Sequence, residues 1–433
     1  MWVFVVLAIA PSVAPAQETR PAEVVASGQV FVDALTTALK SGNFATALAL
    51  LEDYPDIAAT AEGVRLRAEL LARLGRPSEA IALLEGHLAQ DGTDALARYQ
   101  VGEIHFNARR DASAILAYRL ALAGHLDPER RRLVVDRLAA LEARRDVRFS
   151  LSFGVAPDSN LNSATSASTI DIFGLPFTLS DEARRRSGVA ASISGAVERR
   201  GRISDGFSML VGGSLALLDA PGRAFDQRQV GVFAGPEIML APYTRASMAV
   251  TYRDIALGGE GLETWAGVRV DGEGYVNPQT LWSASAHLDQ ISNQRAGEWD
   301  GWTYGGQVNR TRFLGPSAFW RASAAWDVHD LAGSEAGFQM QQLAVGRLVS
   351  LPFSSLAYVE PYARRRDFEH RSSAFGVRRE DHEIGVNVRI SKRDWAFRGA
   401  FPYVQGVSSR SWSNVALGEY SRHRLEFGLT RDF

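Results

Sequence analysis

The chain has 433 residues and carries 47 Lys and Arg against 49 Asp and Glu, so its formal net charge is −2. This balance excludes the strongly basic surface typical of a nucleic-acid-binding protein. The absence of cysteine excludes disulfide scaffolds, thiolate metal sites and thiol nucleophiles. No apolar run reaches the length of about 18 residues that spans a membrane as a helix, whereas strands that alternate apolar and polar residues remain compatible with the composition.

The N-terminal residues 1–16 are predicted to form a secretory signal peptide. An apolar stretch is followed by the small-residue sequence Ala14-Pro15-Ala16, which matches the pattern of a cleavage site. The stretch lacks Lys and Arg, so a buried segment of the mature protein is the alternative. Residues 17–27 are polar and contain proline, and we expect them to form a linker. The mature chain should therefore lie beyond the inner membrane.

Residues 28–145 are predicted to form a periplasmic domain of helical repeats. The segment is dense in Ala, Leu, Glu and Arg, which favour helices. Residues 41–52 align with residues 74–85, and a weaker third copy follows at a similar offset. A period of about 33 to 34 residues is that of the tetratricopeptide repeat (TPR). An all-helical domain with coincidental spacing is the alternative, and either array would present a concave surface that suits a protein partner.

Five small or apolar residues are the expected packing positions of these repeats. Gly75 should turn the chain between two helices, Ala80 is small where the helices cross, and Leu84 fills the groove beside it. In the third copy, Gly102 and Ala114 occupy the corresponding positions. Most of the bulky positions typical of TPR motifs are replaced in this chain.

From residue 147 to residue 433 the sequence alternates between apolar and polar residues, which predicts strands with one apolar face. About 14 strands are expected, an even number that suits a closed antiparallel barrel. Their predicted starts lie near residues 147, 187, 204, 226, 243, 261, 278, 299, 317, 337, 354, 378, 395 and 421. The longest loop is expected at residues 157–186.

Alternation alone does not distinguish a soluble sandwich from a barrel in lipid. The polar faces here are rich in Gly, Ser, Ala, Asn and Gln, as suits a crowded lumen, and Lys392 is the single lysine after Lys40. Tryptophan and tyrosine also fall at strand ends, where membrane interfaces lie. We therefore predict a multidomain α + β protein in which a TPR-like α-helical repeat domain precedes a ~14-stranded antiparallel transmembrane β-barrel.

The last predicted strand ends on an aromatic residue. Leu425, Phe427, Leu429 and Phe433 share its apolar face, and Phe433 is the final residue of the sequence. This arrangement resembles the assembly signal of bacterial outer-membrane barrels. The strand must also pair with the first strand to close the cylinder.

A short motif after the first strand carries the most specific resemblance. Pro157, Asp158, Ser159, Asn160 and Asn162 form a Pro-Asp-Ser-Asn-x-Asn sequence, which is similar to the stretch at the first barrel strand of the surface lipoprotein assembly modulator family. With the helical repeats and the closing strand, the mature chain resembles this family throughout. Its short, degenerate repeat domain departs from the family pattern and leaves the class of client open.

The resemblance implies an outer-membrane translocator that delivers lipoproteins or soluble secreted proteins across the outer membrane. The helical domain would capture the client and the barrel would provide the exit. Its expected partners are the client, periplasmic chaperones, the barrel assembly machinery and outer-membrane lipid, with no nucleic acid. No cofactor, metal or enzymatic activity is expected.

Three alternatives remain at this stage. Asp158, Asn160 and Asn162 have the spacing that begins a calcium loop, but Ser163 and Thr169 stand where Gly and Glu are needed, so Asx turns are the preferred interpretation. An exopolysaccharide export porin also combines repeats with a barrel. A barrel enzyme would use His287 and Asp289 as base and orienting group, although no nucleophile motif accompanies them.

Overall fold

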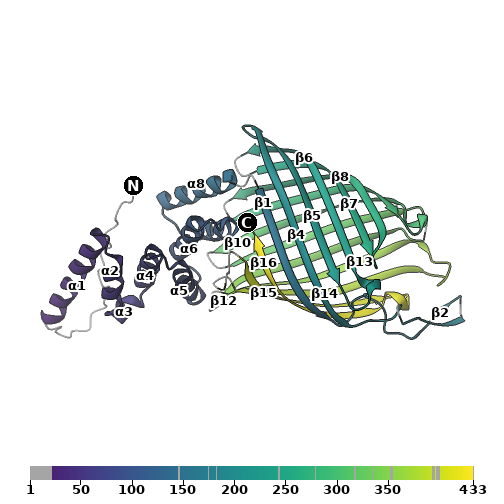
Figure 1. Ribbon diagram of the computed structural model, residues 1–433, viewed down its shortest axis with the longest axis horizontal. Helices are drawn as coiled ribbons and strands as arrows, with labels where there is room; N and C mark the ends of the chain where they lie inside the picture. Colours follow the sequence, from purple (N-terminus) through teal and green to yellow (C-terminus); the bar gives the residue numbers. More distant parts are fainter. Residues whose placement is uncertain are drawn as a thin grey trace. The chain divides into compact units, whose positions relative to one another are not determined.

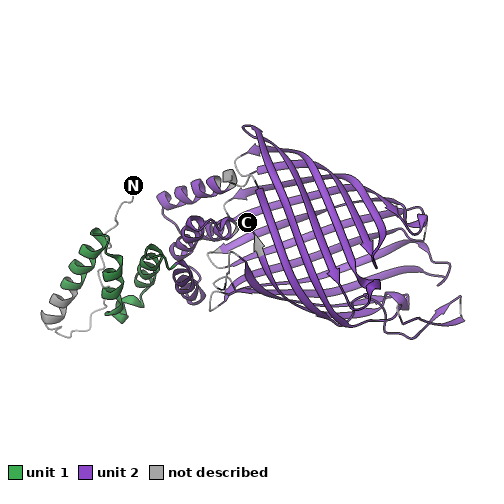
Figure 2. Ribbon diagram, in the orientation of Figure 1, with its two compact units in different colours: residues 1–76 green, residues 77–433 purple. Residues whose placement is uncertain are grey.

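The computed structural model describes residues 22–144, 147–173, 175–181, 183–241, 244–277, 279–315, 318–333, 335–351, 355–392, 395 and 400–432. The predicted signal peptide and Phe433 lie outside these ranges. Contacts divide the chain into two compact units, residues 1–76 and residues 77–433 (Figure 2).

The first unit is helical and comprises α1 (Ala22–Lys40), α2 (Phe44–Glu52), α3 (Pro55–Ala58) and α4 (Ala61–Arg73). Its core is formed by Phe31, Leu51 and Ala58, with the ring of Tyr54 4.3 Å from that of Phe31. Because α1 begins at Ala22, residues 22–27 are helical and are not the linker that was predicted.

The second unit begins with α5 (Pro77–Gln90), α6 (Ala95–Asn107), α7 (Asp111–Ala123) and α8 (Pro128–Arg144). Helices α4 and α6 begin 34 residues apart, at Ala61 and Ala95, and so do α5 and α7, at Pro77 and Asp111. This spacing agrees with the predicted period. None of the helices in the described part of the chain is long and apolar enough to span a membrane.

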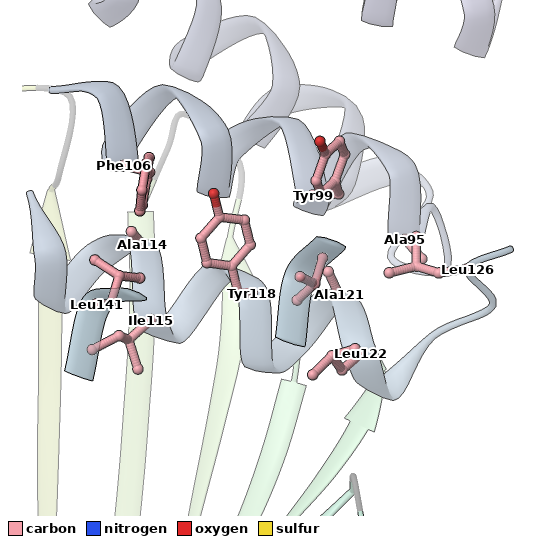
Figure 3. Close-up of a cluster of buried hydrophobic side chains, with 11 residues drawn as sticks. Ala95, Tyr99, Phe106, Ala114, Ile115, Tyr118, Ala121, Leu122, Leu126 and Leu141 are labelled. Carbon is pink, nitrogen blue, oxygen red and sulfur yellow. The ribbon is translucent and has the colours of Figure 1, made fainter. Parts of the chain in front are cut away.

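A buried aromatic cluster joins α6, α7 and α8. Tyr118 is fully buried between Tyr99 and Phe106, with 6.4 Å between ring centroids on each side (Figure 3). Ala114 of α7 and Leu141 of α8 are also fully buried in this cluster. Gly102 of α6 lies against Tyr118, and a Cβ atom at this position would be 2.6 Å from the ring. The helices therefore approach closely where small residues face an aromatic ring.

Within the described ranges, fourteen antiparallel strands follow and close into a barrel, as predicted (Figure 1). The strands are β1 (Val147–Asp158), β4 (Gly188–Ser204), β5 (Phe207–Asp219), β6 (Gln227–Ala241), β7 (Thr244–Leu257), β8 (Glu260–Asn277), β9 (Thr280–Asn293), β10 (Gly301–Gly315), β11 (Ala318–Leu331), β12 (Phe338–Leu351), β13 (Ser355–Arg371), β14 (Arg378–Lys392), β15 (Phe401–Ser413) and β16 (Tyr420–Asp432). The largest departure from the predicted starts is at β15, which was expected near residue 395. The loop between β1 and β4 contains a hairpin of β2 (Thr169–Ile172) and β3 (Leu175–Thr178), which was not predicted.

The apolar faces of the strands point outward. Exposed hydrophobic side chains occur at alternate positions, as at Phe153 and Val155 of β1 or Met209 and Val211 of β5. Val250 and Leu343 are exposed by 64% and 65%. A soluble protein would bury these side chains, whereas a barrel in a bilayer places them against lipid. The prediction of an outward apolar face and an inward polar face is confirmed.

Candidate functional site

The barrel closes where β1 meets β16, and this seam has a shorter ladder than the other side of β1. β1 pairs with β4 over its whole length, from Val147 to Asp158. Its pairing with β16 runs from Ser150 to Val155 and resumes only at Asp158, which lies opposite Arg424. The break contains Pro157, which has no backbone N–H to donate. The first and last strands are thus held by fewer backbone hydrogen bonds along this part of the seam.

Side chains of the Pro-Asp-Ser-Asn-x-Asn motif reinforce the seam beyond this break. Asp158 is 4% exposed, and its Oδ2 accepts hydrogen bonds from Nη2 and Nε of Arg422 at 2.6 Å and 2.9 Å. Asn160 is fully buried, and its Nδ2 donates to the carbonyl of Ser421 at 3.2 Å. We call Asp158, Asn160 and Arg422 the seam clasp. It joins the end of β1 to the start of β16, at the end of the barrel away from the chain's entry into β1.

The rest of the motif extends the contacts on both sides of β1. Ser159 exchanges two hydrogen bonds with His423 of β16, at 2.8 Å and 2.9 Å. Asn162 donates to the carbonyl of Arg184 at 2.8 Å and accepts from the backbone N–H of Arg186 at 3.1 Å, in the segment that leads into β4. The motif therefore ties together three strands that are neighbours around the barrel.

The oxygens that suggested a calcium loop are occupied by hydrogen bonds. The N–H of Asn160 donates to Oδ1 of Asp158 at 2.9 Å, which is an Asx turn. Oδ1 of Asn160 accepts from the N–H of Ala164 at 3.0 Å. These contacts confirm the interpretation of the motif as a loop held by Asx turns.

The predicted residues of the closing strand lie on the outer face of β16. Leu425, Phe427 and Leu429 are exposed by 41%, 50% and 50%. Phe427 lies opposite Val155 and Leu429 lies opposite Phe153, so the apolar faces of β1 and β16 are continuous across the seam. The proposed assembly role of Phe433 remains a prediction.

The predicted repeat residues occupy turn or packing positions. Gly75 follows α4 with a φ of 75°, a conformation that favours glycine. Ala80, Leu84 and Ala114 are fully buried. None of these positions identifies a client-binding residue, and the concave surface remains a prediction.

A buried polar group accompanies the aromatic cluster of the helices. Glu103 accepts hydrogen bonds from Tyr118 Oη at 2.5 Å and from Arg137 Nε at 3.0 Å. Burial raises the pKa of the Tyr118 hydroxyl well above its ordinary value, and the hydrogen bond to the Glu103 carboxylate raises it further. Tyr118 is therefore a neutral donor that fixes α7 to α6.

Helix α7 packs against side chains that point into the barrel, a contact that the sequence did not reveal. Leu120 and Ala123 of α7 form one buried cluster with Leu281, Phe313 and Phe319. The neighbours of these barrel residues on the opposite face, Trp282, Leu314 and Trp320, are exposed on the outside, so the clustered residues are on the lumen side.

Polar contacts between the helices and the barrel lie beside this buried cluster. Gln279, in the turn between β8 and β9, donates from Nε2 to the carbonyl of Ala123 at 3.1 Å. Arg98 of α6 forms a buried ion pair with Glu85 at 2.7 Å and donates to Ser350 Oγ of β12 at 2.9 Å. The helices α5 to α7 are thus fixed to the end of the barrel where β9 and β11 begin.

His287 and Asp289, the residues that the alternative of a barrel enzyme would use, do not pair with each other. His287 Nε2 lies 3.5 Å from Asp327 Oδ1 of β11, and Asp289 accepts a hydrogen bond from Thr251 of β7 at 3.0 Å. His287 and Asp289 are two positions apart on one strand, so their side chains lie on the same side of the sheet. Each nevertheless contacts a residue of a different strand instead of the other. His287 and Asp289 thus lack the hydrogen bond to each other that a catalytic dyad would need.

A closed barrel with an apolar outer face and a polar inner face defines an outer-membrane β-barrel protein. The model of the surface lipoprotein assembly modifier family matches residues 148–433, which is the whole barrel except its first residue. The chain belongs to this family. Its role therefore lies in the outer membrane, in the assembly of surface lipoproteins.

Several solved barrels resemble the chain only in fold. A FadL homologue of Pseudomonas aeruginosa shares 10% identity over 74% of this chain and 93% of its own, with a TM-score of 0.38. The outer-membrane channel DcaP of Acinetobacter baumannii shares 12% identity over 66% of this chain and 96% of its own, with a TM-score of 0.39. Values this low carry no argument about function. No curated protein sequence matches the chain.

Proposed function

We propose that the protein is an outer-membrane translocator that delivers client lipoproteins, or soluble secreted proteins, to the cell surface. The helical domain would face the periplasm and capture the client before folding is complete. The barrel would then provide the exit, through its lumen or by opening between β1 and β16. The family, whose name refers to surface lipoproteins, supports the client class.

The docking of α7 onto lumen-side residues is the observation that carries this proposal. Leu120 is 1% exposed and packs on Leu281, Phe313 and Phe319. A client bound by the neighbouring helices would consequently be held beside the mouth of the barrel. A helical domain joined only by a flexible linker would not provide this proximity.

The described residues show no nucleotide-binding motif, so the free energy of transport would come from client folding outside or from release by periplasmic chaperones. Insertion of the barrel would depend on the barrel assembly machinery. The family and the barrel indicate a non-enzymatic role. Exopolysaccharide export, the alternative from a different class, has no observation in its favour once the family is known.

The proposal is tested by surface exposure of a lipoprotein encoded beside this gene. In cells that lack the protein, antibody labelling of that lipoprotein on intact cells should fall to background, while its total amount stays within about twofold. Restoring the wild-type chain should restore labelling. Unchanged labelling in the deletion strain, or loss of surface polysaccharide instead, would contradict the proposal.

A further inference from the structure

Five large side chains form a patch on the outer face of the barrel, across β9 to β12. They are Trp282, Arg310, Arg312, Trp320 and Arg347, which we call the Trp–Arg patch. Register places them side by side: Arg310 lies opposite Trp282, Arg312 opposite Trp320, and Trp320 opposite Arg347. Strand spacing makes the patch about 14 Å wide.

Two of the three arginines lie over tryptophan rings. The guanidinium of Arg310 lies 5.8 Å from the centroid of Trp282, and that of Arg347 lies 4.9 Å from the centroid of Trp320. Both tryptophans remain exposed on the outside, by 41% and 38%. The stacking orders these two guanidinium groups without neutralising their charge.

No carboxylate in the described ranges forms an ion pair with Arg310, Arg312 or Arg347. The exposed side chains around them are apolar, namely Val270, Val276, Val308, Leu314, Val345 and Val359. Two other outward arginines of the barrel, Arg228 and Arg365, differ in this respect. Arg228 pairs with Asp254 at 3.1 Å, and Arg365 pairs with Asp367 at 2.8 Å.

The patch lies at the end of the barrel that contacts α7. Leu281, Phe313 and Phe319, which pack on the helix, are the sequence neighbours of Trp282, Arg312 and Trp320 and point to the opposite face. Tryptophan at the end of a transmembrane strand marks the level of the lipid head groups. Three cations without a carboxylate at this depth attract the phosphate groups of anionic lipids.

We infer that the Trp–Arg patch binds the phosphate of an anionic glycerophospholipid. Guanidinium groups match phosphate oxygens in a planar, two-point geometry, and the tryptophan rings cover the adjoining glycerol region. The orientation proposed above makes this the periplasmic leaflet. The lipid would set the depth of the barrel directly beneath the docked helices and would steady the end of β9 to β12 that carries them.

The test uses the purified full-length protein in detergent, titrated with phosphatidylglycerol, phosphatidylcholine or lipopolysaccharide, with bound lipid counted by native mass spectrometry. The triple variant Arg310→Gln, Arg312→Gln, Arg347→Gln should bind phosphatidylglycerol at least tenfold more weakly than wild type. The matched control is Arg410→Gln. Arg410 also faces outward and stacks on a tryptophan, Trp412 at 5.3 Å, but stands alone at the other end of the barrel, and this variant should match wild type.

Three results would overturn the inference: equal binding by the triple variant and wild type, equal binding of phosphatidylcholine and phosphatidylglycerol by wild type, or preferential binding of lipopolysaccharide. Heat-modifiable mobility, the gel shift between the folded and boiled barrel, verifies that each variant is folded. The three single Gln variants are measured in parallel, and each should weaken binding by about threefold. They provide the test if the triple variant fails to assemble. Since no client takes part, a negative result here leaves the translocation proposal untouched.

Discussion

At the scale of single residues, the seam clasp depends on a buried charge with one cationic partner. Asp158 is 4% exposed, and Arg422 supplies two hydrogen bonds to one of its carboxylate oxygens. Removing the cation would leave the buried carboxylate with the N–H of Asn160 as its remaining hydrogen-bond donor among those described above, which costs more than the pair contributes. The clasp is therefore a place where a single substitution weakens barrel closure.

We predict that Arg422→Ala destabilises the barrel by about 1 to 3 kcal/mol, since Arg422 is partly solvent-exposed and its pair is weaker than a fully buried one. The double variant Asp158→Asn, Arg422→Gln removes both charges and should recover part of the loss. Urea midpoints read from heat-modifiable mobility measure both effects. A midpoint for Arg422→Ala equal to that of wild type would show that the clasp contributes nothing to closure.

A second residue-scale prediction concerns the close approach of α6 and α7. Gly102→Ala would place a Cβ 2.6 Å from the ring of Tyr118, which is fully buried and has no room to move, so we expect a loss of about 1 to 3 kcal/mol. Gly86→Ala is the matched control. Gly86 lies inside α5 with no neighbouring atom within 4 Å of its Cβ position, and alanine there should stabilise the helix by about 0.5 to 1 kcal/mol.

Hydrogen exchange over α6 and α7 in the full-length protein distinguishes these two outcomes. Faster exchange is expected for Gly102→Ala and equal or slower exchange for Gly86→Ala. The same direction of change in both variants would contradict the packing argument.

At the scale of elements, the shortened ladder between β1 and β16 makes this pair the expected point of opening. The seam lacks pairing at Ala156 and Pro157, whereas β1 pairs with β4 throughout. Backbone hydrogen bonds in a bilayer have no water to replace them, so strands part most readily where the ladder is shortest. Passage through the lumen and passage through the seam can therefore be distinguished by preventing the seam from opening.

A disulfide across the seam separates the two routes. Ser152 and Thr430 lie opposite each other with their hydroxyl oxygens 2.9 Å apart, and the chain has no cysteine of its own. We expect the oxidised pair Ser152→Cys, Thr430→Cys to block client delivery and the reduced pair to permit it. The control pair is Ser283→Cys, Asn309→Cys on β9 and β10, where the side chains lie 3.3 Å apart. Full delivery with the seam oxidised would assign passage to the lumen instead.

The last strand carries a prediction of its own. Deleting Phe433 should impair barrel assembly, because the sequence alternation predicts that this residue shares the apolar face of Leu425, Phe427 and Leu429. Heat-modifiable mobility of the variant in membrane fractions measures assembly. Mobility and amount equal to those of wild type would count against an assembly signal at this position.

At the scale of the whole molecule, the barrel was predictable because each of its strands carries a local signal. Lipid on one side and a polar lumen on the other impose a period of two on every strand, as at Ile384 to Ile390 of β14. The predicted start of β15 preceded Phe401 because Trp395 and Phe397 alternate with Ala396 and Arg398 in the sequence. The helical region was visible in its composition and its 34-residue spacing.

The contacts that position the candidate site were not predictable. Asp158 was singled out as part of a motif, but its partner Arg422 lies 264 residues away and has no local signature. Leu120 looks like any apolar residue of a helix, and its packing on Phe313 and Phe319 depends on the tertiary fold. The unpaired arginines of the outer face likewise become visible only when register places Arg312 and Arg347 on either side of Trp320.

Reconstituted transport is the most direct test of the whole mechanism. Vesicles that contain only the purified chain, with the helical domain outside, would be mixed with an unfolded client lipoprotein and then with protease. We expect the client to become protected inside vesicles with wild type, but not inside empty vesicles or vesicles with Leu120→Asp, in which the helix no longer packs on the barrel. A client that stays fully accessible to protease with wild-type protein would contradict translocation by this chain.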